Sequence, residues 1–563
     1  MRSANQPLHG SGHVSPASQI RWVLVAAILS ACAPAEEPES DAVVSQDTGG
    51  LFGDSAGADA VGSDAAGSDA TGEDQDGEGD TTKPKDFDSG PGLMGGTLLS
   101  GMLVTPLDAF AGQLLVQGDL ITCVQPGKGC QAKADAAGAK SIDTQGIIAP
   151  GLIDMHNHIL FDIFDDDDWI PSKSYFNHNE WPKEPRYGAM LDVKQCLENA
   201  SQGKPTWCSA DKLAYATKDG NVKCEMNKWG ELKGLVAGTT SIVGLPGVAQ
   251  ACFHSIARSI GTPHNDLADD RIQTSALFPP STSSADGVCK NYASGTTEAY
   301  LIHCGEGIDQ IAKNEFKTLL SVTTEDGCLL HPGTVLTHAT AFGKEEFATM
   351  KANGVKLTWS PASNVALYGA TTDIPAALDA GVLVSIGPDW SMGGSQNMLD
   401  ELRYADAWDN NYWGNRLSPQ DLLLMATLNG AYSLGLQGEI GQLKVGLKAD
   451  LFVYEGDQAK PFDALLKATP AEVKLVMVNG VALYGDVALQ GLAGDNPGCE
   501  KLALCGRSKF ACIAENSSAD KLGQTLSDIQ TVLEKALVDV DAATPQDGWN
   551  FAPLTPLVKC GKP

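Results

Sequence analysis

The 563-residue sequence predicts an α/β protein: a distorted (β/α)8 TIM barrel with a composite β-sandwich built from segments on both sides of the barrel. Three observations predict this fold. Short apolar runs alternate with helical segments between residues 151 and 437, which is typical of parallel βα units. Strand-like runs flank this region at 96–150 and 438–490. Polar residues suited to metal binding follow several of the apolar runs.

Residues 1–32 are expected to form a secretory signal. Arg21 precedes a short apolar run that ends in Leu29-Ser-Ala-Cys32, and this run is too short for a permanent membrane helix. The last four residues resemble the bacterial lipoprotein box, which implies that Cys32 is lipidated. The protein would then be anchored in the cell envelope, on the periplasmic or outer-surface side. A plain signal peptide, in which Cys32 has no special role, is the alternative.

Residues 33–92 are expected to be a disordered linker. A five-residue Gly/Asp/Ala repeat runs through 57–76, and 36–88 holds sixteen acidic residues against two lysines. Such a segment buries too little apolar surface to fold, and its charges repel one another. The formal net charge of the chain, −31, argues against nucleic acid as a partner.

Both sides of the barrel carry strand signals. On the N-terminal side they precede residue 150, and on the C-terminal side an Asn479-Gly480 turn indicates a hairpin. The predicted strands are Thr97–Val104, Gln113–Gln117, Leu120–Val124, Gly441–Val445, Ala449–Tyr454, Val473–Val478 and Val481–Tyr484.

The barrel strands are read from apolar runs separated by helical segments. The predicted strands are Leu152–Met155, Thr239–Leu245, Arg271–Ala276, Ala299–His303, Thr334–His338, Lys356–Trp359 and Leu383–Ile386. The predicted helices include Lys344–Asn353, Ile374–Ala380 and Gln420–Leu434. A Cys-containing C-terminal extension, 491–563, is expected to contain the helix Ala519–Val540.

The fourteen cysteines favour disulfides in an oxidising compartment. Cys123 and Cys130 flank a turn that can bring them together. Removal of Cys32 from the count leaves thirteen, so at least one thiol is unpaired.

His156 and His158 follow the apolar strand that opens the barrel. Residues i and i+2 of a strand point to the same face, so the two imidazoles converge. His303, His338 and Asp389 each end or follow a later predicted strand, where active sites of this architecture collect. Three of these four histidines together with Asp389 would form an open metal site, with one position left for water.

Several longer motifs carry a family resemblance. The chain resembles the amidohydrolase superfamily, in the branch of cytosine deaminase and chlorohydrolase, from about residue 96 to 486. The motifs lie in family order at 150–158, 303–306, 360–364, 387–389, 425–431 and 441–450. Pro388 and Trp390 depart from the usual pattern around Asp389 and are expected to reshape the pocket wall.

The resemblance implies roles for individual residues. His156, His158, His303 and Asp389 would bind one divalent metal, with zinc expected first and iron as the alternative. Glu306 would be the proton shuttle. His338 would orient water or substrate, and Asp389 with His338 would accept the proton of the attacking water. Binuclear relatives use a lysine after the fourth strand, and 275–281 contains none.

The expected function is hydrolysis of a non-peptide C–N bond in a small molecule by metal-activated water, either deamination of a cyclic amidine or opening of a cyclic amide. The alternatives are a prolidase-like hydrolase of linear amides or dipeptides and a catalytically silent metal-binding lipoprotein. The membrane is expected as a partner only through Cys32, and a homo-oligomer is left open.

The loop after the first barrel strand is rich in aromatic residues between 159 and 231. It would either cover a flat heterocycle as a lid or pack as a disulfide-stapled surface. Cys304, next to His303 on its strand, is expected to face away from the metal.

Overall fold

The computed structural model describes residues 94–203, 205–209, 221–244, 256–260, 267, 272–494, 498–515, 521–543 and 548–561. The predicted signal sequence, Cys32 and the linker 33–92 lie outside these residues. Within the described ranges, no helix is both long and apolar enough to cross a membrane. The domain bounds given above stay predictions.

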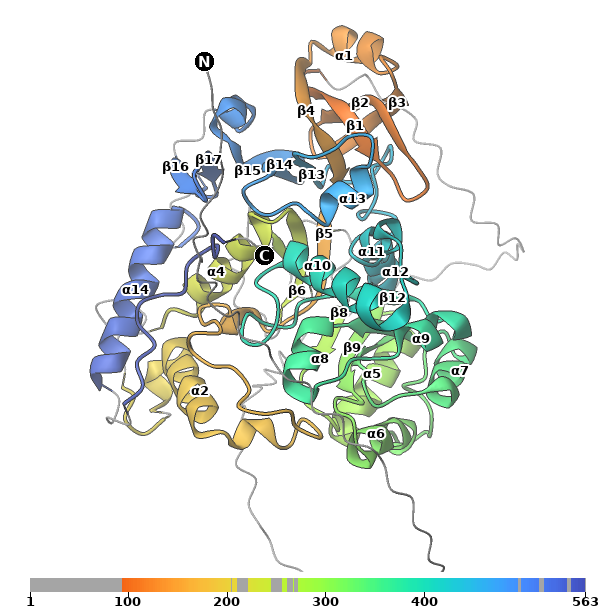
Figure 1. The fold of residues 1–563 in the computed structure, drawn as a ribbon, viewed down its shortest axis with the longest axis vertical. Coiled ribbons are helices and arrows are strands. Elements are labelled where there is room, and N and C mark those ends of the chain that lie inside the picture. The colour runs from red at the N-terminus through yellow and green to blue at the C-terminus, as the bar shows by residue number, and fades with distance from the viewer. Residues whose placement is uncertain are drawn as a thin grey trace, which may run out of the picture. The chain divides into compact units, whose positions relative to one another are not determined.

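Strands from both sides of the central region join one sheet, as predicted. Its order is β16-β17-β15-β14-β13-β4-β1-β2-β3. The two halves meet where β4 pairs antiparallel with β13, Ile148 opposite Val453 (Figure 1). The strands are β1 (Thr97–Val104), β2 (Ala109–Gln117), β3 (Leu120–Pro126), β4 (Lys140–Pro150), β13 (Leu451–Tyr454), β14 (Val473–Val478) and β15 (Val481–Asp486). Whether this sheet is folded into a two-layer sandwich stays a prediction.

The predicted strand Gly441–Val445 is wrong. These residues form turns, and the backbone after them bonds across to β3 instead: Gly446 N donates to Ile121 O (2.9 Å), and Ile121 N donates to Leu447 O (2.9 Å). The segment therefore attaches to the sheet at one point and does not continue as a strand.

The C-terminal extension contributes two strands that the sequence did not predict. β16 (Cys499–Leu504) and β17 (Arg507–Cys512) form a hairpin that pairs with β15. The predicted helix of the extension is α14 (Leu526–Ala543), which contacts α2 (Pro185–Glu198) and α4 (Lys223–Leu235). The extension is thus part of the folded body.

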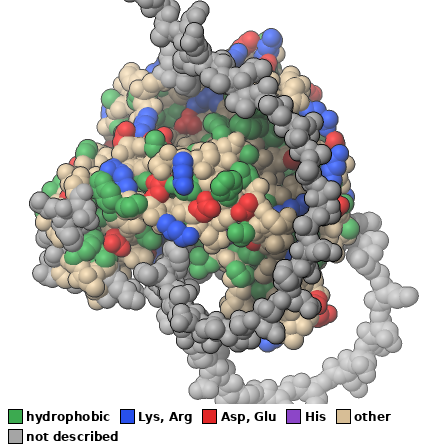
Figure 2. All heavy atoms as spheres, turned by 60° about the horizontal axis from the view of Figure 1, so that its bottom comes forward, with side chains coloured by type: hydrophobic (Ala, Val, Ile, Leu, Met, Phe, Trp, Pro, Cys, Tyr) green, Lys and Arg blue, Asp and Glu red, His purple; other side chains and the backbone are tan. Residues whose placement is uncertain are grey.

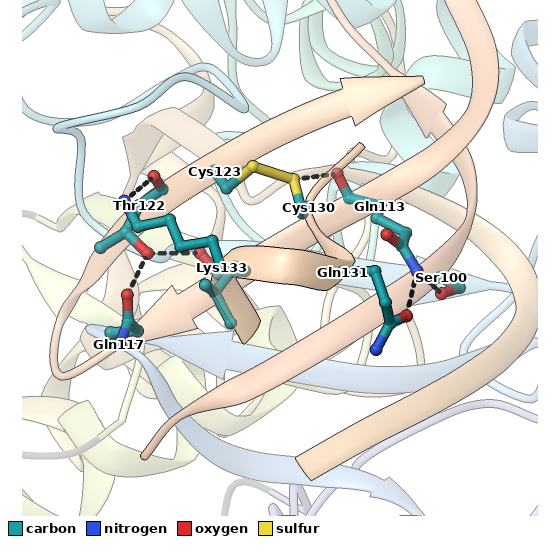
Figure 3. The surroundings of a disulfide bond; sticks show 9 residues. Ser100, Gln113, Gln117, Thr122, Cys123, Cys130, Gln131 and Lys133 are labelled. Atoms are coloured by element: carbon teal, nitrogen blue, oxygen red, sulfur yellow. Dashed lines mark hydrogen bonds between the residues drawn. A yellow bond between two sulfur atoms is a disulfide. The ribbon is translucent and has the colours of Figure 1, made fainter. Parts of the chain in front are cut away.

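Disulfide bonds cross-link several segments of the described chain. Cys123–Cys130 closes the turn after β3, as predicted, next to Gln113, Thr122 and Lys133 (Figure 3). Further bonds are Cys196–Cys208, Cys289–Cys328, Cys499–Cys512 and Cys505–Cys560. Cys224 is also disulfide-bonded. Among the described cysteines Cys304 is free and buried, which accounts for the odd thiol.

The central region carries eight described parallel strands in two sheets. β5 (Leu152–Asn157), β6 (Thr239–Gly244) and β7 (Arg258–Ser259) form one sheet. The other sheet contains β8 (Ile272–Ser275), β9 (Ala299–Cys304), β10 (Thr334–His338), β11 (Lys356–Trp359) and β12 (Val384–Ile386). A parallel bridge between Asn157 and Asp389 links the strand ends of β5 and β12. Pairing of β7 with β8 is not seen among the described residues, so barrel closure stays a prediction.

Helices separate the parallel strands, as expected for βα units. They are α5 (Thr282–Ser294), α6 (Gln310–Ser321), α7 (Lys344–Ala352), α8 (Pro361–Tyr368), α9 (Ile374–Ala380), α10 (Met398–Trp408), α11 (Pro419–Met425) and α12 (Leu428–Leu434). The other helices are α1 (Gln131–Ala137) and α13 (Pro461–Leu465), with short turns η1 (Ile159–Phe161), η2 (Trp181–Lys183), η3 (Ala200–Gln202), η5 (Asp409–Trp413) and η6 (Val487–Leu492).

The single helix predicted over Gln420–Leu434 is two helices, α11 and α12. The break lies at Ala426, whose carbonyl accepts a hydrogen bond from Ile153 N of β5 (2.7 Å). Tertiary pairing to β5 therefore takes the carbonyl that a continuous helix would have used.

The surface seen in Figure 2 carries basic and acidic side chains interspersed with apolar ones. The polar residues of the predicted site are instead buried among the parallel strands.

Candidate metal centre

Four side chains from three distant parts of the sequence meet at the ends of the parallel strands. His156 lies on β5 and His158 directly follows it, His303 lies on β9, and Asp389 follows β12. Backbone hydrogen bonds hold Asp389 next to these two histidines. Asp389 N donates to His156 O (2.8 Å), and His158 N donates to Asp389 O (2.6 Å). The predicted ligands are thus brought together.

The donor atoms of this set face one another. His303 Nε2 lies 3.0 Å from His156 Nε2 and 3.2 Å from His158 Nε2. Asp389 Oδ1 lies 3.4 Å from Nε2 of both His156 and His158. Zinc–nitrogen bonds of about 2.0–2.1 Å in a tetrahedron require donors about 3.3–3.4 Å apart. The four distances, 3.0–3.4 Å, are close to this separation.

The second nitrogen of two imidazoles has its own partner. His303 Nδ1 lies 3.1 Å from the carbonyl oxygen of Ser275, which can only accept, so Nδ1 carries the proton. His156 Nδ1 lies 3.0 Å from Ser360 Oγ. The carbonyl of Ser275 therefore fixes the His303 tautomer and leaves its Nε2 lone pair for a metal, and the Ser360 hydroxyl can accept a proton from His156 Nδ1 to the same effect.

Burial keeps the imidazoles neutral. It lowers the pKa of His156 and His158 well below the ordinary value, and neighbouring histidines add to the effect. Burial and His338 lower the pKa of His303 to about 4. Burial also raises the pKa of Asp389 well above its usual range, with Glu306 adding to it. Three neutral imidazole nitrogens and one carboxyl group form a donor set that suits a divalent metal.

The backbone at the site is held in unusual conformations. Asp389 has φ 74° and His338 has φ 70°, a region that residues other than glycine enter rarely. Such positions persist only where surrounding contacts hold them, and they cluster at functional sites. Asp389 is held by its two backbone bonds to the His156–His158 segment.

Glu306 and His338 lie beside the predicted metal ligands. Nε2 of His338 is 3.9 Å from Oε2 of Glu306, and its Nδ1 is 2.8 Å from Oδ1 of Asn364. His338 also forms a second compact donor group with His156 and Asp389. Burial alone would raise the pKa of the Glu306 carboxyl, but the electrostatic effect of the neighbouring imidazoles, His338 first, and the hydrogen bond from Tyr368 outweigh it, so the pKa is lowered.

Aromatic side chains form one wall of the site. The Trp390 ring lies 5.6 Å from the His158 ring, 5.8 Å from Phe161 and 5.3 Å from Trp181, measured between centroids. Trp390 therefore shapes the wall next to Asp389, as its position in the sequence predicted. Trp169 is buried and joins the same group of rings, whereas Phe176 is exposed. These contacts fit both the lid and the packing interpretations.

Other predictions concern residues around the site. Cys304 is buried, its pKa is raised well above the usual value by burial and then by Glu315, and it belongs to neither donor group. Asn364 contacts the site through His338. His178, which follows no predicted barrel strand, pairs with Glu315 (2.6 Å). His254 and His264 lie outside the described residues.

Sequence reasoning missed three groups that contact the site. Ser275 and Ser360 orient ligand histidines, and Tyr368 donates a hydrogen bond to Oε1 of Glu306 (2.6 Å). Ser360 is the first residue of the family motif at 360–364, so its place in that motif could have indicated a role at the site. Tyr368 ends the helix after that motif, and only the fold shows where its hydroxyl lies.

The comparisons with known proteins agree with this arrangement. Residues 264–483 match the model of the Amidohydrolase family. The chain is 26% identical to a 5'-deoxyadenosine deaminase of Methanothermobacter thermautotrophicus, over 62% of this chain and 85% of the relative. It is 25% identical to a 5-methylthioadenosine/S-adenosylhomocysteine deaminase of Moorella thermoacetica, over 69% and 94%.

Two solved structures show a similar fold. Guanine deaminase from Bradyrhizobium japonicum aligns with a TM-score of 0.51 and 16% identity, covering 70% of this chain and 99% of that one. Triazine hydrolase from Arthobacter aurescens aligns with a TM-score of 0.50 and 17% identity, covering 69% and 94%. At these identities the likeness concerns the fold alone.

Proposed function

We infer that this chain is a hydrolase of the amidohydrolase superfamily that acts on carbon–nitrogen bonds other than peptide bonds, and we propose that one divalent metal held by His156, His158, His303 and Asp389 is its cofactor. The observation that carries the proposal is the convergence of these four donors beside Glu306, with His303 Nε2 3.0 and 3.2 Å from the other two imidazoles and Asp389 Oδ1 3.4 Å from His156 and His158. Zinc is the first choice and iron the second, because both bind imidazole and carboxylate.

A bound divalent metal would supply Lewis-acid activation of a water molecule at neutral pH. The chain supplies the proton transfers. Glu306 starts as a carboxylate because its pKa is lowered, so it can accept a proton and then donate it to the departing nitrogen. His338 offers a lone pair at Nε2, because Nδ1 faces the oxygen of Asn364, and it can orient the attacking water. Asp389 is the second acceptor for that proton.

We propose a flat heterocyclic amidine as the substrate class, deaminated to release ammonia. The ring wall of Trp390, Phe161 and Trp181 supports this class, since aromatic faces bind planar rings by stacking. The two relatives from Methanothermobacter thermautotrophicus and Moorella thermoacetica are named as deaminases of adenosine derivatives, which contain such an amidine. Opening of a cyclic amide uses the same chemistry and is the second candidate.

The test is turnover by the purified, zinc-loaded full chain, measured as ammonia release for the amidines and by chromatography of the products for the two amides, whose hydrolysis releases no ammonia. The substrates would be 5'-deoxyadenosine, S-adenosylhomocysteine and guanine, with dihydrouracil as the cyclic amide and alanylproline as the linear amide. We expect turnover of an amidine, and its loss in Glu306→Gln. Turnover of alanylproline alone would favour the prolidase-like alternative, and a metal-loaded chain inactive on all five would favour the silent lipoprotein.

We also propose that the protein is anchored in the cell envelope through lipidated Cys32, and that the eight parallel strands close into a barrel. The Leu29–Cys32 motif supports the first proposal and the Asn157–Asp389 bridge the second. Detergent partitioning of the full chain and of Cys32→Ala tests the anchor. Equal partitioning of both into the aqueous phase would contradict it.

A further inference from the structure

We propose that Tyr368 and Trp181 are positioning residues for Glu306, joined by a relay of two hydrogen bonds that fixes which carboxylate oxygen faces the reacting group. The inference rests on the proposed function, in which Glu306 moves protons. Neither residue needs to touch the substrate to have this effect.

The direction of the relay follows from the chemistry of its members. Trp181 Nε1 lies 3.0 Å from the Tyr368 hydroxyl, and that hydroxyl lies 2.6 Å from Glu306 Oε1. An indole N–H can only donate, and a carboxylate can only accept. The Tyr368 proton is therefore directed to Glu306, and burial with the neighbouring carboxylate keeps it there by raising the pKa of the hydroxyl.

The relay leaves the other carboxylate oxygen for the reaction. With Oε1 held, Oε2 is the atom that faces His338 Nε2 across 3.9 Å. That gap is too long for a direct hydrogen bond, so both atoms can bind one reacting group between them. A carboxylate free to rotate would lose this alignment, and misplacement of a reacting group reduces rate steeply.

The relay also connects the aromatic loop to the proton shuttle. Trp181 lies in η2, and its ring contacts Trp390, which lies against His158. The backbone of the same loop is tied to α8, because Tyr175 N donates to Leu367 O (2.7 Å), one residue before Tyr368. The loop that forms the ring wall therefore also sets the position of Glu306.

The kinetic test uses Tyr368→Phe, Trp181→Phe and the double variant, in the zinc-loaded full chain. Tyr368→Phe removes only the donor hydroxyl. We expect kcat to fall roughly tenfold, a part of the 10²–10⁴-fold effect of general acid–base groups, with KM within about twofold. The acid limb of the pH profile should move to higher pH, because loss of a donor to the carboxylate raises its pKa.

The double variant separates positioning from direct contact with substrate. If Trp181 acts on Glu306 through the Tyr368 hydroxyl, Trp181→Phe lowers kcat on its own but does not lower kcat further in the Tyr368→Phe background, while any change in KM reports its place in the ring wall. Additive losses would overturn the relay. Tyr454→Phe is the matched control, because it removes a buried tyrosine hydroxyl that donates to Pro461 O (2.8 Å) in the nine-stranded sheet. It should leave kcat and the pH profile unchanged.

A crystal structure of the zinc-loaded Tyr368→Phe variant gives a readout that needs no substrate. We expect the Glu306 carboxylate to lose its single orientation, and to keep it in Tyr454→Phe. An unmoved carboxylate in Tyr368→Phe would overturn the inference even if the enzyme is active. If the wild-type chain turns over nothing, the proposed function fails, and this structure alone still decides the relay.

Discussion

The nine-stranded sheet and the C-terminal ends of the parallel strands, where the candidate ligands lie, are held in place by different means. The sheet and its extension carry the disulfides Cys123–Cys130, Cys499–Cys512 and Cys505–Cys560. At these strand ends the imidazoles of His156, His303 and His338 are each oriented by a hydrogen bond to one partner, Ser360, Ser275 and Asn364 respectively. We therefore expect substitutions in the sheet to lower stability and leave activity unchanged. Substitutions at the strand ends should lower activity and leave stability nearly unchanged.

The largest effect is expected for His303→Ala. It removes the donor that lies closest to both other imidazoles, so the metal and nearly all turnover should be lost, with kcat/KM down by roughly 10³-fold or more. Metal content by atomic absorption and turnover on the same sample check this. Near-UV circular dichroism serves as the folding control, and a variant that keeps one equivalent of metal would contradict the ligand assignment.

Glu306→Gln should separate chemistry from metal binding. The amide keeps the size of the side chain but cannot shuttle a proton, so kcat is expected to fall by roughly 10²–10⁴-fold. Metal content should stay at the wild-type level, since Glu306 is not among the four donors. Loss of metal together with activity would mean that Glu306 is a ligand.

Ser360→Ala should weaken the metal site without abolishing it. It removes the partner of His156 Nδ1, and loss of such a partner lowers metal affinity by roughly 10–100-fold. Competition with a chelator measures this change. Ser281→Ala, which removes the N-cap of α5, is the control and should leave metal affinity unchanged.

Removal of a disulfide from the nine-stranded sheet is expected to lower stability and to leave metal binding and activity unchanged. Replacement of Cys499 and Cys512 by alanine opens the β16–β17 hairpin and should lower the free energy of unfolding by about 2–4 kcal/mol. Urea denaturation measures the loss. Metal content and kcat at 25 °C should not change; a matching loss of activity would show that the two regions are coupled.

The parts of the fold that local pattern determines were predictable. β10, β11, β14 and α9 have the predicted bounds, because apolar runs and glycine or polar stops define them. His156 and His158 converge because a strand alternates its side chains, and the family motifs pointed to His303 and Asp389.

What was missed depends on long-range contacts. The β16–β17 hairpin joins the sheet because β17 pairs with the edge of β15. The helix predicted over 420–434 is interrupted because Ile153 N of β5 donates a hydrogen bond to Ala426 O. The position of the Tyr368 hydroxyl likewise follows from how α8 packs beside β9. No local pattern in the sequence encodes these partners.

Anomalous diffraction from crystals of the zinc-loaded chain tests the central claim most directly. We predict one zinc peak per chain, bonded at about 2.0–2.2 Å to Nε2 of His156, His158 and His303 and to a carboxylate oxygen of Asp389. A second peak at the site, or a zinc bonded to Cys304 or to only two of these four residues, would contradict the account.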